Sequence, residues 1–91
     1  MAVTFSLPTV LAKLADGQST LQVSGATLGD VVAQLADRFP RLAPRLRDTE
    51  GGPYPFVTFY LNDEDVRFRS GFATPVTEGD EITVVAAIAG G

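Results

Sequence analysis

The chain has 91 residues, of which 45% are hydrophobic and 20% charged, which suits one globular domain with a single core. Its formal net charge of −4 argues against binding to nucleic acid or to an anionic membrane, because both need concentrated positive charge. The sequence contains no cysteine and no histidine, which excludes disulfides, thiolate nucleophiles, the usual zinc sites and imidazole bases. No apolar run approaches the ~20 residues of a membrane span, and no charged signal-peptide region opens the chain, so we expect a cytoplasmic protein.

Two strands are predicted near the N-terminus. Residues 2–7 and 19–24 alternate apolar with polar side chains, the pattern of a half-buried strand. A loop connects them, and Asp16 with Gly17 predicts a turn in that loop. The two strands are therefore expected to form a hairpin.

The strongest helix signal runs from residue 27 to residue 39. Thr27 and Asp30 have the spacing of a capping box, in which both side chains accept from amides of the first turn. Five apolar residues then form a single stripe, while the polar residues face water. The stripe consists of Leu28, Val31, Val32, Leu35 and Phe39. Pro40 ends the helix, which is long enough to cover a sheet.

A short helical turn and one long loop follow. In residues 41–47, Leu42 and Leu46 are spaced to face the core, and three arginines are expected on a solvated face. Residues 48–55 are rich in turn-forming residues and predict the only long loop.

The second half of the chain predicts a further hairpin. Residues 56–61 alternate as a strand, residues 62–65 make a turn, and residues 66–69 return as a strand. The contiguous acids in the turn lack the spacing and the glycine of a calcium loop, so we expect them to be solvated.

The last strand begins at Ile82, after a turn at residues 78–80, and runs into a Gly-Gly terminus. Its alternation places Val85, an apolar residue, on the outer face, where it is a candidate partner contact. The two terminal glycines have no Cβ, so they can enter a narrow channel and leave the terminal carbonyl accessible. This suits chemistry on the C-terminus itself; the plain alternative is a frayed tail that packs against nothing.

The predicted order is strand, strand, helix, short helix, strand, strand, strand. This is an α+β domain with a mixed sheet of about five strands covered by one main helix. A helix between the second and third strands, with a last strand that can lie centrally beside the first, is the grouping of the ubiquitin-like β-grasp. Residues 1–91 are expected to form this single domain, with a flexible tail at residues 86–91.

Four stretches carry a family signature: residues 27–30 (TLGD) with the helix that follows, residues 60–66 (YLNDEDV), residues 77–84 (TEGDEITV), and the terminal Ala89, Gly90 and Gly91. Together they resemble the MoaD/ThiS family of ubiquitin-like sulfur carriers. Within the family the chain looks most like the CysO group, the actinobacterial carriers of cysteine biosynthesis, in residues 3–10, in residues 62–68 and in the loop around residues 51–53. It departs from the family at Ala86 and Ala87, where members often have proline.

The resemblance implies a chemistry for the tail. A partner related to ubiquitin-activating enzymes would use ATP and Mg²⁺ to convert Gly91 to an acyl-adenylate. Sulfide, or a persulfide from a sulfurtransferase, would then displace AMP and leave a C-terminal thiocarboxylate, with Gly90 and Ala89 as the permissive tail. The chain itself would be a protein cosubstrate that binds no cofactor or metal, and not an enzyme. The family docks through an apolar patch beside the tail, and the matching positions here are Val66, Phe68 and Val85.

The recipient of the sulfur stays open. A CysO-like carrier would supply a PLP-dependent cysteine synthase acting on an activated serine, after which a metallopeptidase would release cysteine. Two further possibilities are the small subunit of molybdopterin synthase, against which the loop at residues 48–55 counts, and a donor for a thiosugar-forming enzyme. From a different class, the chain could be a ubiquitin-like modifier joined to lysines, or a binding module whose Gly-Gly is incidental.

Overall fold

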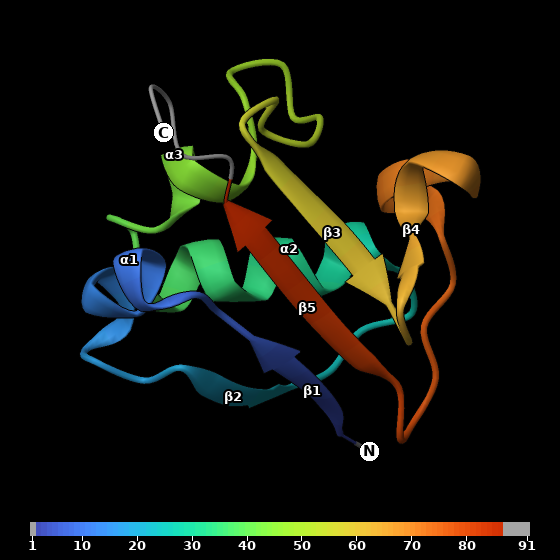
Figure 1. The fold of residues 1–91 in the computed structure, drawn as a ribbon, viewed down its shortest axis with the longest axis horizontal. Coiled ribbons are helices and arrows are strands. Elements are labelled where there is room, and N and C mark those ends of the chain that lie inside the picture. Colours follow the sequence, from blue (N-terminus) through green and yellow to red (C-terminus); the bar gives the residue numbers. More distant parts are fainter. Residues whose placement is uncertain (1, 87–91) are drawn as a thin grey trace.

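The protein, seen in a computed structural model that describes residues 2–86, is a five-stranded mixed sheet with one long helix packed across one face (Figure 1). The sheet order is β2-β1-β5-β3-β4. The strands are β1 (Val3–Ser6), β2 (Thr20–Val23), β3 (Val57–Leu61), β4 (Glu64–Asp65) and β5 (Glu81–Ala86). The helices are α1 (Thr9–Ala12), α2 (Leu28–Arg38) and α3 (Ala43–Leu46), and 3₁₀ turns lie at η1 (Lys13–Ala15), η2 (Val66–Phe68) and η3 (Gly71–Ala73).

The last strand, β5, is central, as the sequence predicts. It runs parallel to β1, with Phe5 opposite Ile82, and antiparallel to β3, with Phe59 opposite Val84. These four side chains are buried on the face that packs against the helices. The α+β grouping predicted from the order of elements is therefore confirmed.

The N-terminal hairpin is confirmed, but its connection is more ordered than expected. β1 and β2 pair antiparallel, with Val3 opposite Val23. The segment between them, predicted as a loop, contains α1 and η1, because Leu11 and Ala15 are apolar and fill the core beside the sheet. The chain then turns back through Asp16 in the left-handed region.

Helix α2 forms as predicted. The Thr27 hydroxyl accepts from the Asp30 amide, and the Asp30 carboxylate accepts from the Thr27 amide, which is the reciprocal capping box. All five residues of the predicted stripe are buried, so this helix supplies the largest apolar surface that covers the sheet. The short helix α3 is also confirmed, with Leu42 and Leu46 fully buried.

The hairpin from β3 to β4 differs from its prediction. Asn62 and Asp63 both adopt positive φ and make a two-residue turn, so β4 begins already at Glu64. The predicted return strand over residues 66–69 is wrong, because the chain leaves the sheet at Val66 and enters η2. The Asp65 carboxylate causes this departure: it accepts from the Arg67 amide at 2.8 Å and caps the 3₁₀ turn.

In the part of the chain from residue 2 to residue 86, no helix has the length and apolar character needed to cross a bilayer.

Candidate functional site at the root of the C-terminal tail

Strand β5 carries the chain to the point where the tail begins. Its last ladder pair is Ala86 opposite Val57, at the end of the sheet that lies near α1 and α3 (Figure 1). Gly91, Gly90 and Ala89, the predicted reacting tail, lie outside the described residues, so their role stays a prediction. The structure does show that whatever follows Ala86 starts from the central strand of a packed sheet.

The other end of β5 is held by a carboxylate. Asp80 Oδ2 accepts from the Thr77 amide at 2.8 Å, and Asp80 Oδ1 accepts from Asn62 Nδ2 at 3.0 Å. The oxygen of the Asn62 side chain in turn accepts from the Glu81 amide at 2.9 Å. Within the turn, Gly79 has a φ of 90°. Residues 77–81 are thereby joined to the turn between β3 and β4. The TEGD stretch of the family signature thus fixes the start of the central strand.

These hydrogen bonds also change the pKa of the Asp80 carboxyl group. The side chain of Asn62, followed by the backbone of Thr77, stabilises the charged form of Asp80 and lowers the pKa of that carboxyl below its usual value. A similar arrangement lowers the pKa of Asp65, whose carboxylate is bonded to the Arg67 side chain and amide. Both acids therefore act as ionised structural anchors at physiological pH.

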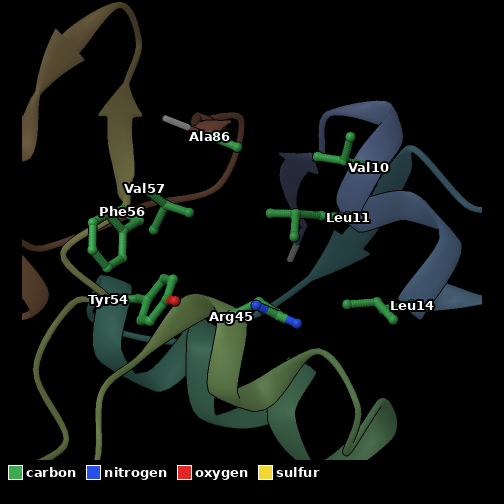
Figure 2. A pocket seen from close by; sticks show the side chains of 8 residues that line it. All are labelled: Val10, Leu11, Leu14, Arg45, Tyr54, Phe56, Val57 and Ala86. Atoms are coloured by element: carbon green, nitrogen blue, oxygen red, sulfur yellow. The ribbon is translucent and has the colours of Figure 1, made fainter. Parts of the chain in front are cut away.

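A groove of about 530 Å³ opens beside the tail root. Figure 2 shows side chains of α1 and η1 on one side of it and side chains of the segment before β3 on the other. The lining residues are Val10, Leu11, Leu14, Arg45, Tyr54, Phe56, Val57 and Ala86. The lining is mostly apolar, and two of its large side chains are more than half exposed, Val10 at 54% and Phe56 at 56%. Exposed apolar side chains gathered at one groove are typical of a binding surface.

The three predicted partner contacts fall in different environments. Val66 is only 1% exposed and belongs to the core, so its side chain is not available to a partner, and its assignment to the docking patch is corrected. Phe68 is 82% exposed and Val85 is 48% exposed, so both side chains are accessible on the surface. Their role in docking stays a prediction.

The 3₁₀ geometry of η2 explains why the side chain of Val66 is buried while that of Phe68 is exposed. In a strand, residues two apart point to the same face, whereas in a 3₁₀ turn each residue rotates by about 120° and residues two apart diverge. Phe68 is left on the outside between two ion pairs, Arg67 with Asp65 at 2.7 Å and Arg69 with Glu64 at 3.2 Å. It lies beyond the edge strand β4, whereas Val85 lies on the central strand one residue before the tail root.

Sequence reasoning missed the groove. Val10, Phe56 and Arg45 come from three separate segments, and only the packing of α1 and α3 around the end of the sheet brings them together. Their one local signal is that two of them are large apolar residues without a predicted place in the core. Val10 lies in the predicted loop between the first two strands, and Phe56 falls on the same face of the predicted strand 56–61 as Thr58 and Tyr60.

Across residues 2–86 there is no cluster of three or more acidic side chains placed to hold a metal ion. The acids of residues 63–65 are instead distributed over a turn and an edge strand, where Glu64 and Asp65 pair with arginines.

Comparison with known proteins decides the family. The ThiS family model matches residues 6–91, nearly the whole chain. The chain belongs to the ThiS family. Of the curated relatives, the sulfur carrier protein CysO of Mycobacterium tuberculosis (strain ATCC 25618 / H37Rv) is 43% identical over 93 residues, in an alignment that covers 100% of both chains. The small archaeal modifier protein 3 of Haloferax volcanii is 36% identical over 66 residues, which cover 72% of this chain and 71% of that protein.

Solved structures agree with the ThiS assignment. A chain in the crystal structure of the BexX/CysO complex of Amycolatopsis orientalis superposes with a TM-score of 0.91 at 37% identity, over 99% of this ThiS-family chain and 100% of that one. The predicted ubiquitin-like β-grasp fold, the family and the similarity to CysO are therefore confirmed. The matched region includes the groove, the TEGD turn and the tail root.

Proposed function

We propose that this ThiS-family chain is a sulfur carrier, a protein cosubstrate whose C-terminal Gly91 is activated and then loaded with sulfur. The observation that carries the proposal is the end-to-end similarity to CysO, 43% identity with 100% coverage of both chains. The arrangement of the fold supports it, because the central strand leads directly from the core to a tail that ends in Gly90 and Gly91.

The chemistry proceeds in two displacements. The Gly91 carboxylate attacks the α-phosphorus of ATP, forms an acyl-adenylate and releases pyrophosphate. Sulfide, or the terminal sulfur of a persulfide, then attacks the acyl carbon, and AMP leaves with the electron pair of the broken C–O bond. With a persulfide, a reductant such as a thiol must cleave the S–S bond to free the thiocarboxylate. The sequence has no cysteine and no histidine, so an adenylating partner of the ubiquitin-activating type supplies the acid–base groups, Mg²⁺ and the sulfur relay.

We propose that the recipient is a cysteine-forming enzyme of the PLP-dependent class. There the thiocarboxylate sulfur displaces the leaving group of an activated serine, an acyl shift to the amino group yields a peptide-linked cysteine, and a metallopeptidase releases the amino acid. The similarity to CysO supports this choice over a molybdopterin synthase. A thiosugar-forming enzyme is a second candidate recipient. The solved BexX/CysO complex supports the general point that a CysO chain assembles with a protein partner.

Intact-mass spectrometry tests the loading step. The purified chain is incubated with ATP, Mg²⁺, a sulfide source and an adenylating enzyme from the same genome, and we expect the mass gain of one oxygen replaced by one sulfur. Deletion of Gly91 is expected to abolish the gain, because removing one residue shortens the reach of the tail by about 3.5 Å. The fold should be unchanged, because Val84 is the last core residue within residues 2–86, seven positions before Gly91. An Ala87→Ser variant serves as the matched control and should load normally.

Two results would contradict the carrier proposal: no mass gain with any adenylating enzyme of the genome, or full loading of the chain that lacks Gly91. A modifier function is the second candidate, and the 36% identity to the small archaeal modifier protein 3 favours it. It predicts ATP-dependent conjugates of higher mass in cell extract, joined through Gly91 to lysine side chains. The carrier proposal predicts a thiocarboxylate without such conjugates.

A further inference from the structure

The groove at the tail root carries a positive charge between apolar walls. Figure 2 shows the side chain of Arg45 lying between Tyr54 on one side and Leu14 on the other. Leu46, the next residue along α3, is fully buried, so this short helix is fixed to the core while Arg45 is exposed at the groove. Among the lining residues, all within residues 2–86, none is an acid. A bound group would therefore meet a guanidinium flanked by apolar surface.

The charge of this region is opposite to that of the protein as a whole. Residues 38–47 contain four of the seven cationic side chains and no acid, whereas the remainder of the chain has eleven acids against three cations. Arg67 and Arg69 form ion pairs, but within residues 2–86 none of the four arginines of residues 38–47 pairs with an acid. Their charge is therefore available to another molecule.

The exposure of the groove walls indicates what kind of molecule fits. Val10 and Phe56 are 54% and 56% exposed, so they stand out from the surface, whereas a small-molecule pocket encloses most of its ligand. Tyr54 and Phe56 pack edge to face with centroids 5.5 Å apart, which gives the groove a preformed aromatic wall. A protein surface is broad enough to cover both walls at once and fits this shape better than a small molecule does.

Arg45 decides the chemistry of that protein surface. A guanidinium covered by a partner loses its hydration, so its burial is favourable only when a carboxylate pairs with it. A second copy of the chain, docked about a twofold axis through this groove, would bring two like charges together. The complement is therefore a segment of a different protein in which a carboxylate lies beside an apolar side chain.

The groove lies within reach of an enzyme that acts on the C-terminus. Ala86 forms part of its lining, and Gly91 follows five residues later, at most about 18 Å of extended chain. We propose that the groove binds a segment of the adenylating partner in which an Asp or Glu side chain lies next to a large apolar one. The carboxylate pairs with Arg45, and the apolar side chain packs against Val10 and Phe56. This inference rests on the proposed function, which supplies the partner.

Isothermal titration calorimetry with the adenylating enzyme of the same genome, without ATP or sulfide, tests the ion pair. Arg45→Glu should raise Kd by at least about 30-fold, because the partner's carboxylate is then buried against a like charge. Arg41→Glu is the matched control. It makes the same change in net charge at an exposed arginine outside the groove lining, and should raise Kd by less than about fivefold.

The apolar half of the groove is tested by Phe56→Ala, which should raise Kd about tenfold because it removes the aromatic wall. Urea unfolding of each variant shows that it is folded. Salt gives a further readout: the Kd of the parent should rise more steeply with KCl concentration than that of Arg45→Met, which lacks the charge.

Three results would overturn the proposal. The first is an Arg45→Glu variant that is folded and binds as tightly as the parent, and the second is an equal loss of affinity in Arg45→Glu and Arg41→Glu. The third is a dimer of the parent that Phe56→Ala dissociates, which would assign the groove to a second copy of the chain. A parent that loads sulfur normally while Arg45→Glu binds unchanged contradicts only this inference, whereas a parent that does not load contradicts the proposed function.

Discussion

Substitution of Val85 by aspartate is the sharpest test of the surface next to the tail. Val85 is 48% exposed and stands on the outer face of β5, opposite Thr58 of β3. Because the side chain is already half in water, the variant should lose no more than about 1 kcal/mol of folding free energy, mainly through strand propensity. If an adenylating enzyme covers this face, the same carboxylate is buried in an apolar contact without a partner. That costs about 3 kcal/mol, or roughly 150-fold in Kd.

Isothermal titration calorimetry with the adenylating enzyme measures the effect, and urea unfolding shows that the variant is folded. Val85→Thr is the matched control, because it keeps the β-branched shape and resembles Thr83, which lies on the same face of β5. It should change Kd by less than about fivefold. A folded Val85→Asp variant that binds as tightly as the parent would show that the outer face of β5 lies outside the interface.

Two further predictions concern the anchors of the fold. Val66→Ala should lower the free energy of unfolding by about 2–3 kcal/mol in urea melts, because it leaves a cavity under η2; an effect confined to partner binding would instead return Val66 to the surface patch. Asp80→Asn should lower stability by about 1 kcal/mol near pH 7, because the ionised carboxylate is the better acceptor for Asn62 and Thr77. Since the pKa of Asp80 is lowered by folding, its stabilisation is present above about pH 4 and is lost as the pH falls through the folded pKa. The free energies of unfolding of the parent and of Asp80→Asn should therefore converge as the pH falls through the folded pKa of Asp80. A difference in acid equal to the difference at pH 7 would argue against a role for the ionised carboxylate.

The parts of the fold that sequence predicts well are those whose information is local. The stripe of α2 and its capping box lie within thirteen residues, from Thr27 to Phe39, and every stripe residue is buried as expected. The alternation of β5 is also local: it predicts Val85 on the outer face, and Val85 is half exposed while Ile82 and Val84 are buried. In both cases one side of an amphipathic element is enough to orient it.

The failures arise where one side chain overrides a periodic pattern. Val66 and Phe68 alternate with arginines as in a strand. However, the Asp65 carboxylate accepts a hydrogen bond from the Arg67 amide, and the chain enters a 3₁₀ turn instead. An Asx-type signal of this kind competes with a strand and wins when the strand is at a sheet edge. The groove is a different case, because its walls come from segments 10–14, 45, 54–57 and 86, and no local pattern predicts their meeting.

The parallel pairing of β1 with β5 has a practical consequence for handling the protein. Because the two strands run in the same direction, residue 2 and residue 86 lie at opposite ends of the sheet (Figure 1). The six residues of β5 correspond to about 20 Å of strand. A fluorophore, an affinity tag or a chip linkage attached before residue 2 would thus stand a full strand length from the tail root. N-terminal attachment is therefore the geometry in which immobilised protein keeps both the groove and the outer face of β5 accessible.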